Sequence, residues 1–384
     1  MRYQGIIITG TSGSGKSTIA KLLSERISTC QMVKAVTTRS KRADDLSDFY
    51  EYIDNEKFQA IEKNLIVSAN YRNCLYGITR EAFQSVVSQK KIPILVLAPT
   101  SKIKEEINLL SFFIDAPDVQ LDERLKAREG TQKDNPEVLT QRKNDRDLSQ
   151  EFTYTVINFN LDKTIEVIKG LWDNRNSGGL LPKQIIQLMI ECGMLLDKVE
   201  NYKNIQGASY DLTLGDEYYS RGRICTLTSK NPFIRIDPYD YAIVTSAENA
   251  NLPRDIAAKF GLTVGLFCQG VILSNGPQVD PGFKGKLFCL LFNTSNSPVV
   301  LKRREHHATI EFNKLLEPAP PYSGKYQGKD EIINYLPSNT LKGAINELKE
   351  ELEEVKSESR RVNANALGII SVFLAILAVL LTLR

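Results

Sequence analysis

The alternation of apolar and polar positions divides the chain into distinct regions. Residues 6–8 form a short apolar run that predicts a buried strand, and a helical pattern through Ile19, Leu22 and Leu23 follows it. From 183 to 328, turn residues separate short apolar runs, which is typical of a mostly β domain. Further on, apolar residues recur every three or four positions, and an uninterrupted apolar segment follows. The pattern therefore predicts two globular domains and two helical segments after them.

The last apolar segment, 362–383, contains no charged residue and is long enough to cross a bilayer as a helix. A core helix is the alternative, but such a helix would normally be shorter and amphipathic. The basic pair Arg360 and Arg361 precedes the segment and marks the side retained in the cytoplasm. We therefore expect a single-pass membrane protein with a C-terminal transmembrane helix and a cytoplasmic N-terminal part.

The apolar residues from Leu341 to Val355 recur at spacings of four and three among Glu and Lys. This pattern predicts a short coiled coil over 337–361. An amphipathic helix that lies on a globular domain is the alternative. Because the stripe mixes Ile and Leu, it is compatible with three strands.

Composition supports two folded domains and narrows the function. The 384 residues are 42% hydrophobic and 25% charged, which is typical of a globular protein rather than a disordered one. A net charge of +3 is too small for a general nucleic-acid binder, so we expect no nucleic-acid partner. Gly, Asn and Pro mark 174–182 as a linker. The expected domains are therefore 1–173 and 183–328.

A glycine-rich motif follows the first strand. It has the pattern G-x-x-x-x-G-K-S with a strand before it and a helix after it, which is the context of a phosphate-binding P-loop. Backbone N–H groups of such a loop surround phosphates, Lys16 reaches the outer phosphates, and the Ser17 hydroxyl is suited to Mg²⁺. The first domain is therefore predicted to bind ATP and Mg²⁺. The expected contacts are Gly10, Ser12, Gly13, Ser14, Gly15, Lys16, Ser17 and Thr18.

Over about 4–172 the chain resembles guanylate kinase. The residues that carry the resemblance are Thr37–Arg42 (T-T-R-x-x-R), Tyr50, Tyr76–Gly77, Arg124, Arg128 and Arg142. It implies an α/β fold with a parallel sheet, and an acceptor monophosphate held by Arg39, Arg42, Tyr50 and Tyr76. Guanidinium groups pair bidentately with phosphate oxygens, and phenols donate to the remaining ones. It also implies a catalytic set of Lys16, Arg124, Arg128 and Arg142.

Two carboxylate positions of that family are apolar in this chain. The guanine-reading glutamate falls on Val67, and the strand expected to read I-L-D-x-D is 94–98, Ile-Leu-Val-Leu-Ala. A carboxylate that pairs with the guanine N–H donors is worth several kcal/mol, so its loss removes the preference for guanine. We therefore expect either another nucleoside monophosphate acceptor, including a deoxynucleotide, or an inactive site.

The region from about 180 to 328 resembles the dCTP deaminase and dUTPase superfamily. The matching segments are Ala208–Gly215, Val279–Gly285 and Tyr326–Gly328. The resemblance implies a mostly β fold, a homotrimer with sites between subunits, and a nucleotide pocket. The pocket residues implied are Asp211, Asp280, Phe283 and Gln327.

This domain lacks the catalytic acid of a deaminase. The proton-shuttling glutamate falls on Leu291, and the Arg-Ser-Ser stretch falls on 261–265, which reads Gly-Leu-Thr-Val-Gly. A leucine cannot act as a general base. Three interpretations stay open: a pocket that binds a nucleotide without converting it, which we favour, an unused pocket in a trimeric scaffold, and dUTPase-type hydrolysis through Asp280.

Two functions from different classes fit these features. The first is a membrane-anchored, ATP-dependent (deoxy)nucleoside monophosphate kinase whose second domain senses a nucleotide or trimerises. The second is a nucleotide-responsive sensor with a membrane effector helix, for example in phage defence. The intact P-loop favours the first hypothesis, and the fusion to a membrane helix favours the second.

Overall fold

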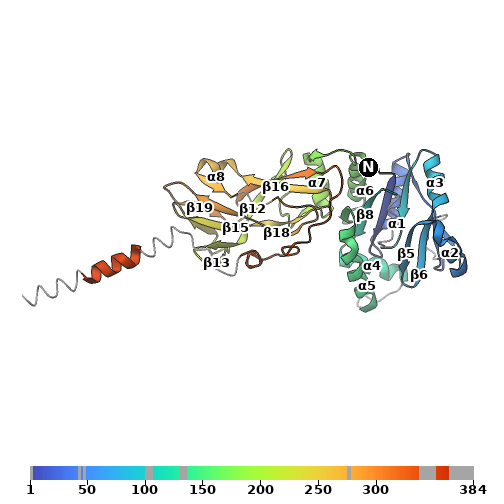
Figure 1. Cartoon of the computed structure of the whole chain (residues 1–384), viewed down its shortest axis with the longest axis horizontal. Coiled ribbons are helices and arrows are strands. Elements are labelled where there is room, and N and C mark those ends of the chain that lie inside the picture. Colours follow the sequence, from blue (N-terminus) through green and yellow to red (C-terminus); the bar gives the residue numbers. More distant parts are fainter. Residues whose placement is uncertain are drawn as a thin grey trace, which may run out of the picture.

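A computed structural model describes residues 3–41, 45, 49–99, 107–129, 136–274, 278–336 and 352–362 (Figure 1). The first domain contains a five-stranded parallel sheet in the order β2-β7-β1-β8-β9. Its strands are β1 (Gly5–Gly10), β2 (Cys30–Met32), β7 (Ile92–Val96), β8 (Leu109–Asp115) and β9 (Tyr154–Ile157). Its helices are α1 (Lys16–Arg26), α3 (Arg80–Ser88), α4 (Asp118–Glu129), α5 (Pro136–Asp147) and α6 (Leu161–Asp173).

The apolar strands of this sheet are covered on both faces. Ile6 and Ile8 pack with α1 and α6, whereas Ile7, between them, packs with α3 and a second, smaller sheet. All three isoleucines are fully buried, because successive side chains of a strand point to opposite faces. The predicted parallel-sheet α/β domain is therefore confirmed.

The smaller sheet of the first domain has the order β4-β3-β6-β5. Its elements are β3 (Ala35–Thr37), β4 (Tyr50–Tyr52), β5 (Leu65–Tyr71) and β6 (Cys74–Thr79), with α2 (Asn55–Ile61) after β4. Since β3 and β4 carry Thr37 and Tyr50 and β6 carries Tyr76, this sheet brings the predicted monophosphate-binding segments together.

The second domain is built mostly of antiparallel strands, as predicted. One sheet follows the order β10-β20-β12-β15-β18-β17, with β11, β13 and β16 paired beside this path, and β14 pairs with β19. The strands are β10 (Gly179–Leu180), β11 (Leu195–Asp197), β12 (Ser209–Ser220), β13 (Arg223–Thr226), β14 (Phe233–Ile236), β15 (Tyr241–Asn251), β16 (Ile256–Leu262), β17 (Val271–Leu273), β18 (Lys284–Asn293), β19 (Val299–Lys302) and β20 (His306–Lys314). Its helices are α7 (Lys183–Glu191) and α8 (Val264–Cys268). Strand β10, which pairs with β20, lies inside the segment predicted as a linker, 174–182.

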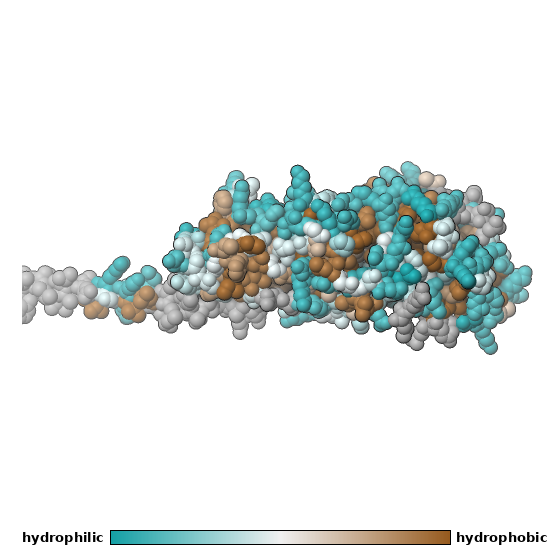
Figure 2. Space-filling view, turned by 90° about the horizontal axis from the view of Figure 1, so that it is seen from above, coloured by the Kyte–Doolittle hydropathy of each residue, from teal (hydrophilic) through white to brown (hydrophobic). Residues whose placement is uncertain are grey.

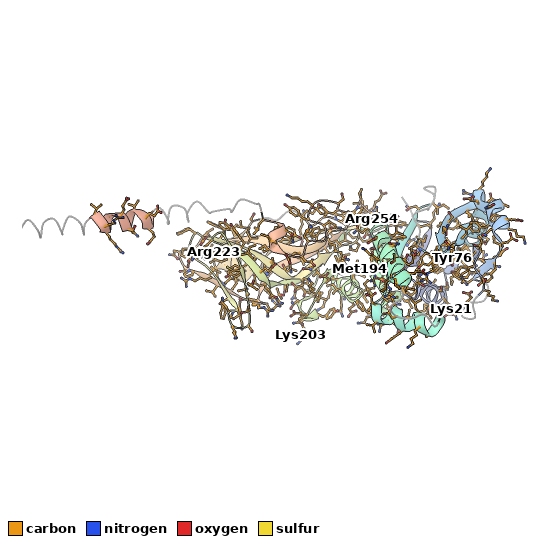
Figure 3. The ribbon with its side chains drawn as sticks, turned by 90° about the horizontal axis from the view of Figure 1, so that it is seen from below. Lys21, Tyr76, Met194, Lys203, Arg223 and Arg254 are labelled. Atoms are coloured by element: carbon orange, nitrogen blue, oxygen red, sulfur yellow. The ribbon has the colours of Figure 1, made fainter. Side chains whose placement is uncertain are left out.

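The two domains share a continuous apolar core. Helices α6 and α7 pack against each other across the boundary, and the Ile157 N–H donates to the Cys192 carbonyl over 2.8 Å. Met194 and Arg254 lie where the domains meet (Figure 3). Arg254 donates to the Glu151 carbonyl over 2.6 Å, so it links the second domain to the first. The first domain is therefore positioned by packing and hydrogen bonds rather than by a free linker.

The predicted membrane localisation is corrected by the structure. Across the described ranges, no helix is both long and apolar enough to cross a membrane. The described helical segment nearest to the predicted span is 352–362. It carries acidic and basic side chains throughout, among them Glu353 and Lys356. The expectation of a single-pass protein with a C-terminal anchor and a cytoplasmic N-terminal part is therefore wrong, and the rest of the predicted span, 363–383, lies outside the described residues.

The predicted coiled coil, 337–361, is described only from residue 352. That part is helical, and its apolar side chains Leu352 and Val355 are exposed. The remainder, 337–351, lies outside the described residues. The coiled coil therefore stays a prediction.

Candidate functional site

The predicted P-loop connects β1 to α1 at the carboxyl edge of the parallel sheet. Gly10 has φ 138°, and a Cβ atom there would lie 1.9 Å from the Ile114 carbonyl oxygen, so only glycine fits. Gly15 precedes the helix with φ 96°, and its Cβ would lie 2.9 Å from the Asn158 amide nitrogen. The glycines therefore permit both the turn and the close approach of neighbouring strands.

Lys16 begins α1 and folds back over its own loop. Its ammonium donates to the Gly10 carbonyl over 2.9 Å and to the Thr11 carbonyl over 2.6 Å. Burial lowers the pKa of Lys16 to about 8. Burial disfavours the charged form of Lys16, and a bound phosphate would stabilise it. This is the chemistry expected of a P-loop lysine.

Two residues that the sequence reasoning missed, Asn158 and Asp115, bind the P-loop from neighbouring strands. The Asn158 amide, after β9, donates to the Ser14 carbonyl over 2.9 Å, and the Thr11 hydroxyl donates to Asp115 over 2.7 Å. Arg124 of α4 donates to the Gly13 carbonyl over 3.1 Å. Asn158 follows β9 and Asp115 ends β8, so a sheet-edge argument was the available signal for both.

One large cavity, of about 1020 Å³, joins the P-loop to the smaller sheet. Ligand pockets commonly have volumes of about 300 to 1,000 Å³, so this cavity is large even for a nucleotide site. It brings together most of the predicted residues of the first domain. Those that line it are Gly10, Ser12, Gly13, Gly15, Lys16, Ser17, Thr18, Arg39, Tyr50, Tyr76 and Arg124. Tyr76 can be located in Figure 3.

The predicted monophosphate-binding arginine, Arg39, is paired with a carboxylate inside the cavity. Its guanidinium donates to both oxygens of Asp45, over 2.7 and 2.5 Å, and lies 4.7 Å from the centre of the Tyr50 ring. The Tyr52 hydroxyl donates to the same carboxylate over 2.6 Å. Arginine pairs in this bidentate way with carboxylates and with phosphates. Burial raises the pKa of Tyr50 to about 12, so its phenol keeps its proton.

Several predicted residues are placed differently. Arg142 is 6% exposed, and donates to Asp118 over 3.0 Å and to Asp122 over 2.8 Å, so its guanidinium is held by two carboxylates of α4. The side chain of Ser14 is buried beneath the loop. Arg42 and the side chain of Arg128 lie outside what the structure describes.

Part of the cavity wall is apolar. Val96, Leu97 and Ala98 line the cavity, and Val67 is 1% exposed within the core of the smaller sheet. Among the described lining residues, Asp45 is the one carboxylate, and it is occupied by Arg39. The structure therefore offers no acidic partner for guanine N–H donors along the described wall.

The predicted pocket residues of the second domain form two separate groups. Gln327 accepts from the Lys284 N–H over 2.9 Å and donates to the Gly282 carbonyl over 2.9 Å, so it fixes the loop that carries Asp280 and Phe283. The Phe283 ring packs edge-on against Tyr322.

Asp211 belongs to β12 instead. It accepts from Thr309 over 2.9 Å and from Gln206 over 2.8 Å. In the described chain, no hydrogen bond or ion pair joins Asp211 to the loop of Asp280.

The residue at the expected position of the deaminase acid is part of the core. Leu291 of β18 is fully buried in an apolar cluster with Ala242 and Val271. A cavity of about 80 Å³ lies beside Gln327 and Arg254 at the domain boundary, which is too small for a nucleotide.

Comparisons with known proteins agree with this geometry. The guanylate kinase family model matches residues 2–174, and the dCTP deaminase-like family model matches residues 180–315. A guanylate kinase from Synechocystis sp. is 32% identical over 174 residues, covering 43% of this chain and 91% of that protein.

Two archaeal proteins match the second domain. A dCTP deaminase from Thermococcus gammatolerans is 38% identical over 131 residues, covering 34% of this chain and 82% of that protein. A dCTP deaminase from Pyrococcus abyssi is 35% identical over 140 residues, covering 36% of this chain and 90% of that protein. The chain therefore belongs to the guanylate kinase family over residues 2–174 and to the dCTP deaminase-like family over residues 180–315.

Proposed function

We propose that the protein is an ATP-dependent kinase of nucleoside monophosphates. The observation that supports this best is the single cavity shared by Lys16 on the P-loop and by Arg39, Tyr50 and Tyr76 on the smaller sheet. It offers one site for a donor triphosphate and one for an acceptor monophosphate. Two bound phosphate groups in one cavity are the arrangement that phosphoryl transfer requires.

ATP and Mg²⁺ are the proposed co-substrate and metal. The Ser17 hydroxyl lines the cavity next to Lys16, so the residues present fit a Mg²⁺ ion shared with nucleotide phosphates. The ion would neutralise phosphate charge. Lys16 would hold the outer phosphates, and Arg124, already bound to the loop at Gly13, would lie along them.

The acceptor base is proposed to be other than guanine. The reason is the apolar wall at Val96, Leu97 and Ala98 together with the buried Val67. The test is to incubate the full chain with Mg-ATP and each ribo- and deoxynucleoside monophosphate and to separate the products by chromatography. We expect diphosphate from at least one acceptor, with no preference for a guanine nucleotide. No diphosphate from any acceptor would contradict the proposed kinase.

Arg39→Ala is expected to weaken binding of the acceptor monophosphate and to leave ATP binding unchanged. The substitution removes a bidentate, charge-assisted partner of the acceptor phosphate, worth about 1.5 to 3 kcal/mol, or roughly a 10-fold to 150-fold higher acceptor KM. Steady-state kinetics with varied acceptor, together with ATP binding by calorimetry, gives the measurement. Arg26→Ala is the control, since Arg26 forms an exposed ion pair with Asp162. Equal loss of both ligands would show that Arg39 is structural.

The second domain is proposed to bind a nucleotide without deaminating it. Leu291 is buried in the core, so the position carries neither an acid nor access to water. We expect no dUTP from dCTP when the purified protein is assayed by chromatography and by ammonia release. Deamination that is lost in an Asp280→Ala variant would contradict this proposal.

A homotrimer is the proposed assembly. Figure 2 shows apolar surface over part of the second domain. Among its exposed side chains are Val264, Phe267 and Ile272, each more than half exposed. Apolar side chains so exposed on a folded domain are typical of a surface that another subunit covers.

A further inference from the structure

The residues that line the large cavity belong to two different sheets. The P-loop follows β1 of the parallel sheet, whereas Tyr50 and Tyr76 lie on β4 and β6 of the smaller sheet. Two phosphate groups held by different sheets react only when the sheets are correctly placed, since a misplacement of about 1 Å can slow a reaction about 100-fold. Contacts that fix the smaller sheet relative to the P-loop therefore bear on the proposed transfer.

Apolar packing joins the β5–β6 hairpin of the smaller sheet to the parallel sheet. Val67 and Ile78 are buried in one cluster with Ile7 of β1, and Tyr71 at the hairpin tip packs against this cluster. Such packing is non-directional, whereas a hydrogen bond restricts both the distance and the angle between its two groups. The hydrogen bonds of the tip therefore indicate how its position is fixed.

The tip of the hairpin is hydrogen-bonded to α5 through a buried carboxylate. The Tyr71 hydroxyl donates to one carboxylate oxygen of Asp145 over 3.0 Å, and the Gln141 amide donates to the other over 2.8 Å. Asp145 is 2% exposed, and a hydrogen bond to a carboxylate is stronger away from water. Burial raises the pKa of Tyr71 above its usual value, so the phenol keeps its proton and remains a donor.

Helix α5 is connected in turn to the P-loop. Arg146, the residue after Asp145, donates to one oxygen of Asp115 at the end of β8 over 2.7 Å. The other oxygen of Asp115 accepts from the Thr11 hydroxyl of the P-loop over 2.7 Å. Two successive residues of α5 therefore link the tip of the smaller sheet to the loop that is proposed to hold ATP.

This link lies close to the proposed site of transfer. Tyr71 lines the same cavity as Lys16. Burial lowers the pKa of Lys16, and the charge of Asp145 opposes this shift. Asp145 is therefore within electrostatic reach of the lysine that is proposed to hold the outer phosphates. Sequence reasoning assigned no role to Tyr71 or to Asp145.

We propose that Tyr71 and Asp145 are positioning residues, which hold the tip of the smaller sheet in place relative to the P-loop during phosphoryl transfer. This inference rests on the proposed kinase function. In the reaction, an oxygen of the acceptor monophosphate bonds to the γ-phosphorus of ATP, and ADP leaves with the electron pair of the broken bond. The Tyr71 hydroxyl is bound to α5, so its effect on this step passes through Asp145.

The first test compares Tyr71→Phe with the parent protein in steady-state kinetics. The substitution removes the hydroxyl and keeps the ring that packs at the cavity. We expect kcat to fall about 10-fold, with the KM for ATP within twofold of the parent, because the P-loop itself is unchanged. Tyr202→Phe is the matched control, since Tyr202 is an exposed phenol of the second domain, and its kcat is expected to equal that of the parent.

A double-mutant cycle tests whether the hydroxyl acts through Asp145. Asp145→Ala is expected to lower kcat at least as much as Tyr71→Phe, and Tyr71→Phe is expected to have no further effect in that background. Asp145→Asn keeps an oxygen that can accept from the phenol, so its kcat is expected to lie between those of the parent and of Asp145→Ala. The thermal midpoint of each variant, measured by calorimetry, shows that it is folded.

The outcomes separate this inference from the function on which it rests. An active parent and an equally active Tyr71→Phe variant, whatever its thermal stability, would overturn the positioning role alone. If Tyr71→Phe lowers kcat equally in the parent and in Asp145→Ala, the hydroxyl acts independently of Asp145, and the inference is wrong. No turnover by the parent with any acceptor would overturn the proposed kinase and the positioning role together.

Discussion

Lys16→Ala is expected to reduce phosphoryl transfer by about 100-fold to 1,000-fold. The side chain that now donates to the Gly10 and Thr11 carbonyls is the one placed to reach the outer phosphates. Removal of one preorganised hydrogen-bond donor that faces the charge of the transition state raises the activation free energy by about 3 to 4 kcal/mol. Each 1.4 kcal/mol is a factor of 10 in rate. The measurement is kcat for the best acceptor under saturating Mg-ATP.

Lys21→Ala provides the control for this prediction. Lys21 lies on the same helix, but it is half exposed and pairs with Glu25 on the surface (Figure 3). Its replacement is expected to leave the rate within about twofold, because exposed ion pairs contribute little. Turnover of Lys16→Ala within a few-fold of the parent would show that the P-loop assignment is wrong.

The lowered pKa of Lys16 predicts that kcat/KM for ATP depends on pH. Burial lowers this pKa to about 8, so the free enzyme loses the charged form as the pH rises through about 8. We expect kcat/KM for ATP to fall above that pH, since this ratio reports ionisations of the free enzyme. If kcat/KM for ATP stays constant up to pH 9.5, the ammonium of Lys16 does not bind the phosphates.

The P-loop could be predicted because all of its determinants are local. Gly10, Gly15 and Lys16 stand at fixed spacing between an apolar run and a helical pattern, and the structure has β1 and α1 at those places. The strands of the second domain were predictable for the same reason, since period and turn residues are properties of short segments.

Interactions between distant polar residues could not be predicted in this way. Arg142 looks like a catalytic arginine by its position, yet its guanidinium is held by Asp118 and Asp122, which lie 24 and 20 residues earlier. The pattern of residue types also does not predict the ion pair between Arg39 and Asp45. Such contacts depend on how α4 and α5 or the smaller sheet pack, and packing is not encoded in the spacing of one segment.

Asp255→Ala is expected to destabilise the junction of the two domains by about 3 to 5 kcal/mol. Asp255 of the second domain accepts from the Tyr154 hydroxyl of β9 and lies 3.3 Å from the Lys314 ammonium. The side chains of Asp255 and Lys314 are 3% and 7% exposed. Removal of the carboxylate would leave a buried ammonium and a buried phenol without their acceptor, which is the costly way to break a buried ion pair.

Asp255→Asn is expected to destabilise the junction less than Asp255→Ala. Burial raises the pKa of Asp255 above the usual carboxyl value, and that of Tyr154 well above its own, so the tyrosine stays a donor. Asp255→Asn keeps an oxygen for the Tyr154 hydroxyl but removes the charge that faces Lys314. We therefore expect the free energy of unfolding of Asp255→Asn to lie between that of the parent and that of Asp255→Ala.

Thermal unfolding followed by calorimetry measures the effect. A loss of about 3 to 5 kcal/mol corresponds to a midpoint lower by roughly 6 to 20 °C in a domain of 150 to 250 residues. Asp162→Ala is the control, because its ion pair with Arg26 is exposed and worth less than about 1 kcal/mol. If Asp255→Ala unfolds at the temperature of the parent, Lys314 has gained another partner or water, and the junction does not depend on this carboxylate. Since β9 also leads to Asn158 beneath the P-loop, a weakened junction should in addition lower the affinity for ATP.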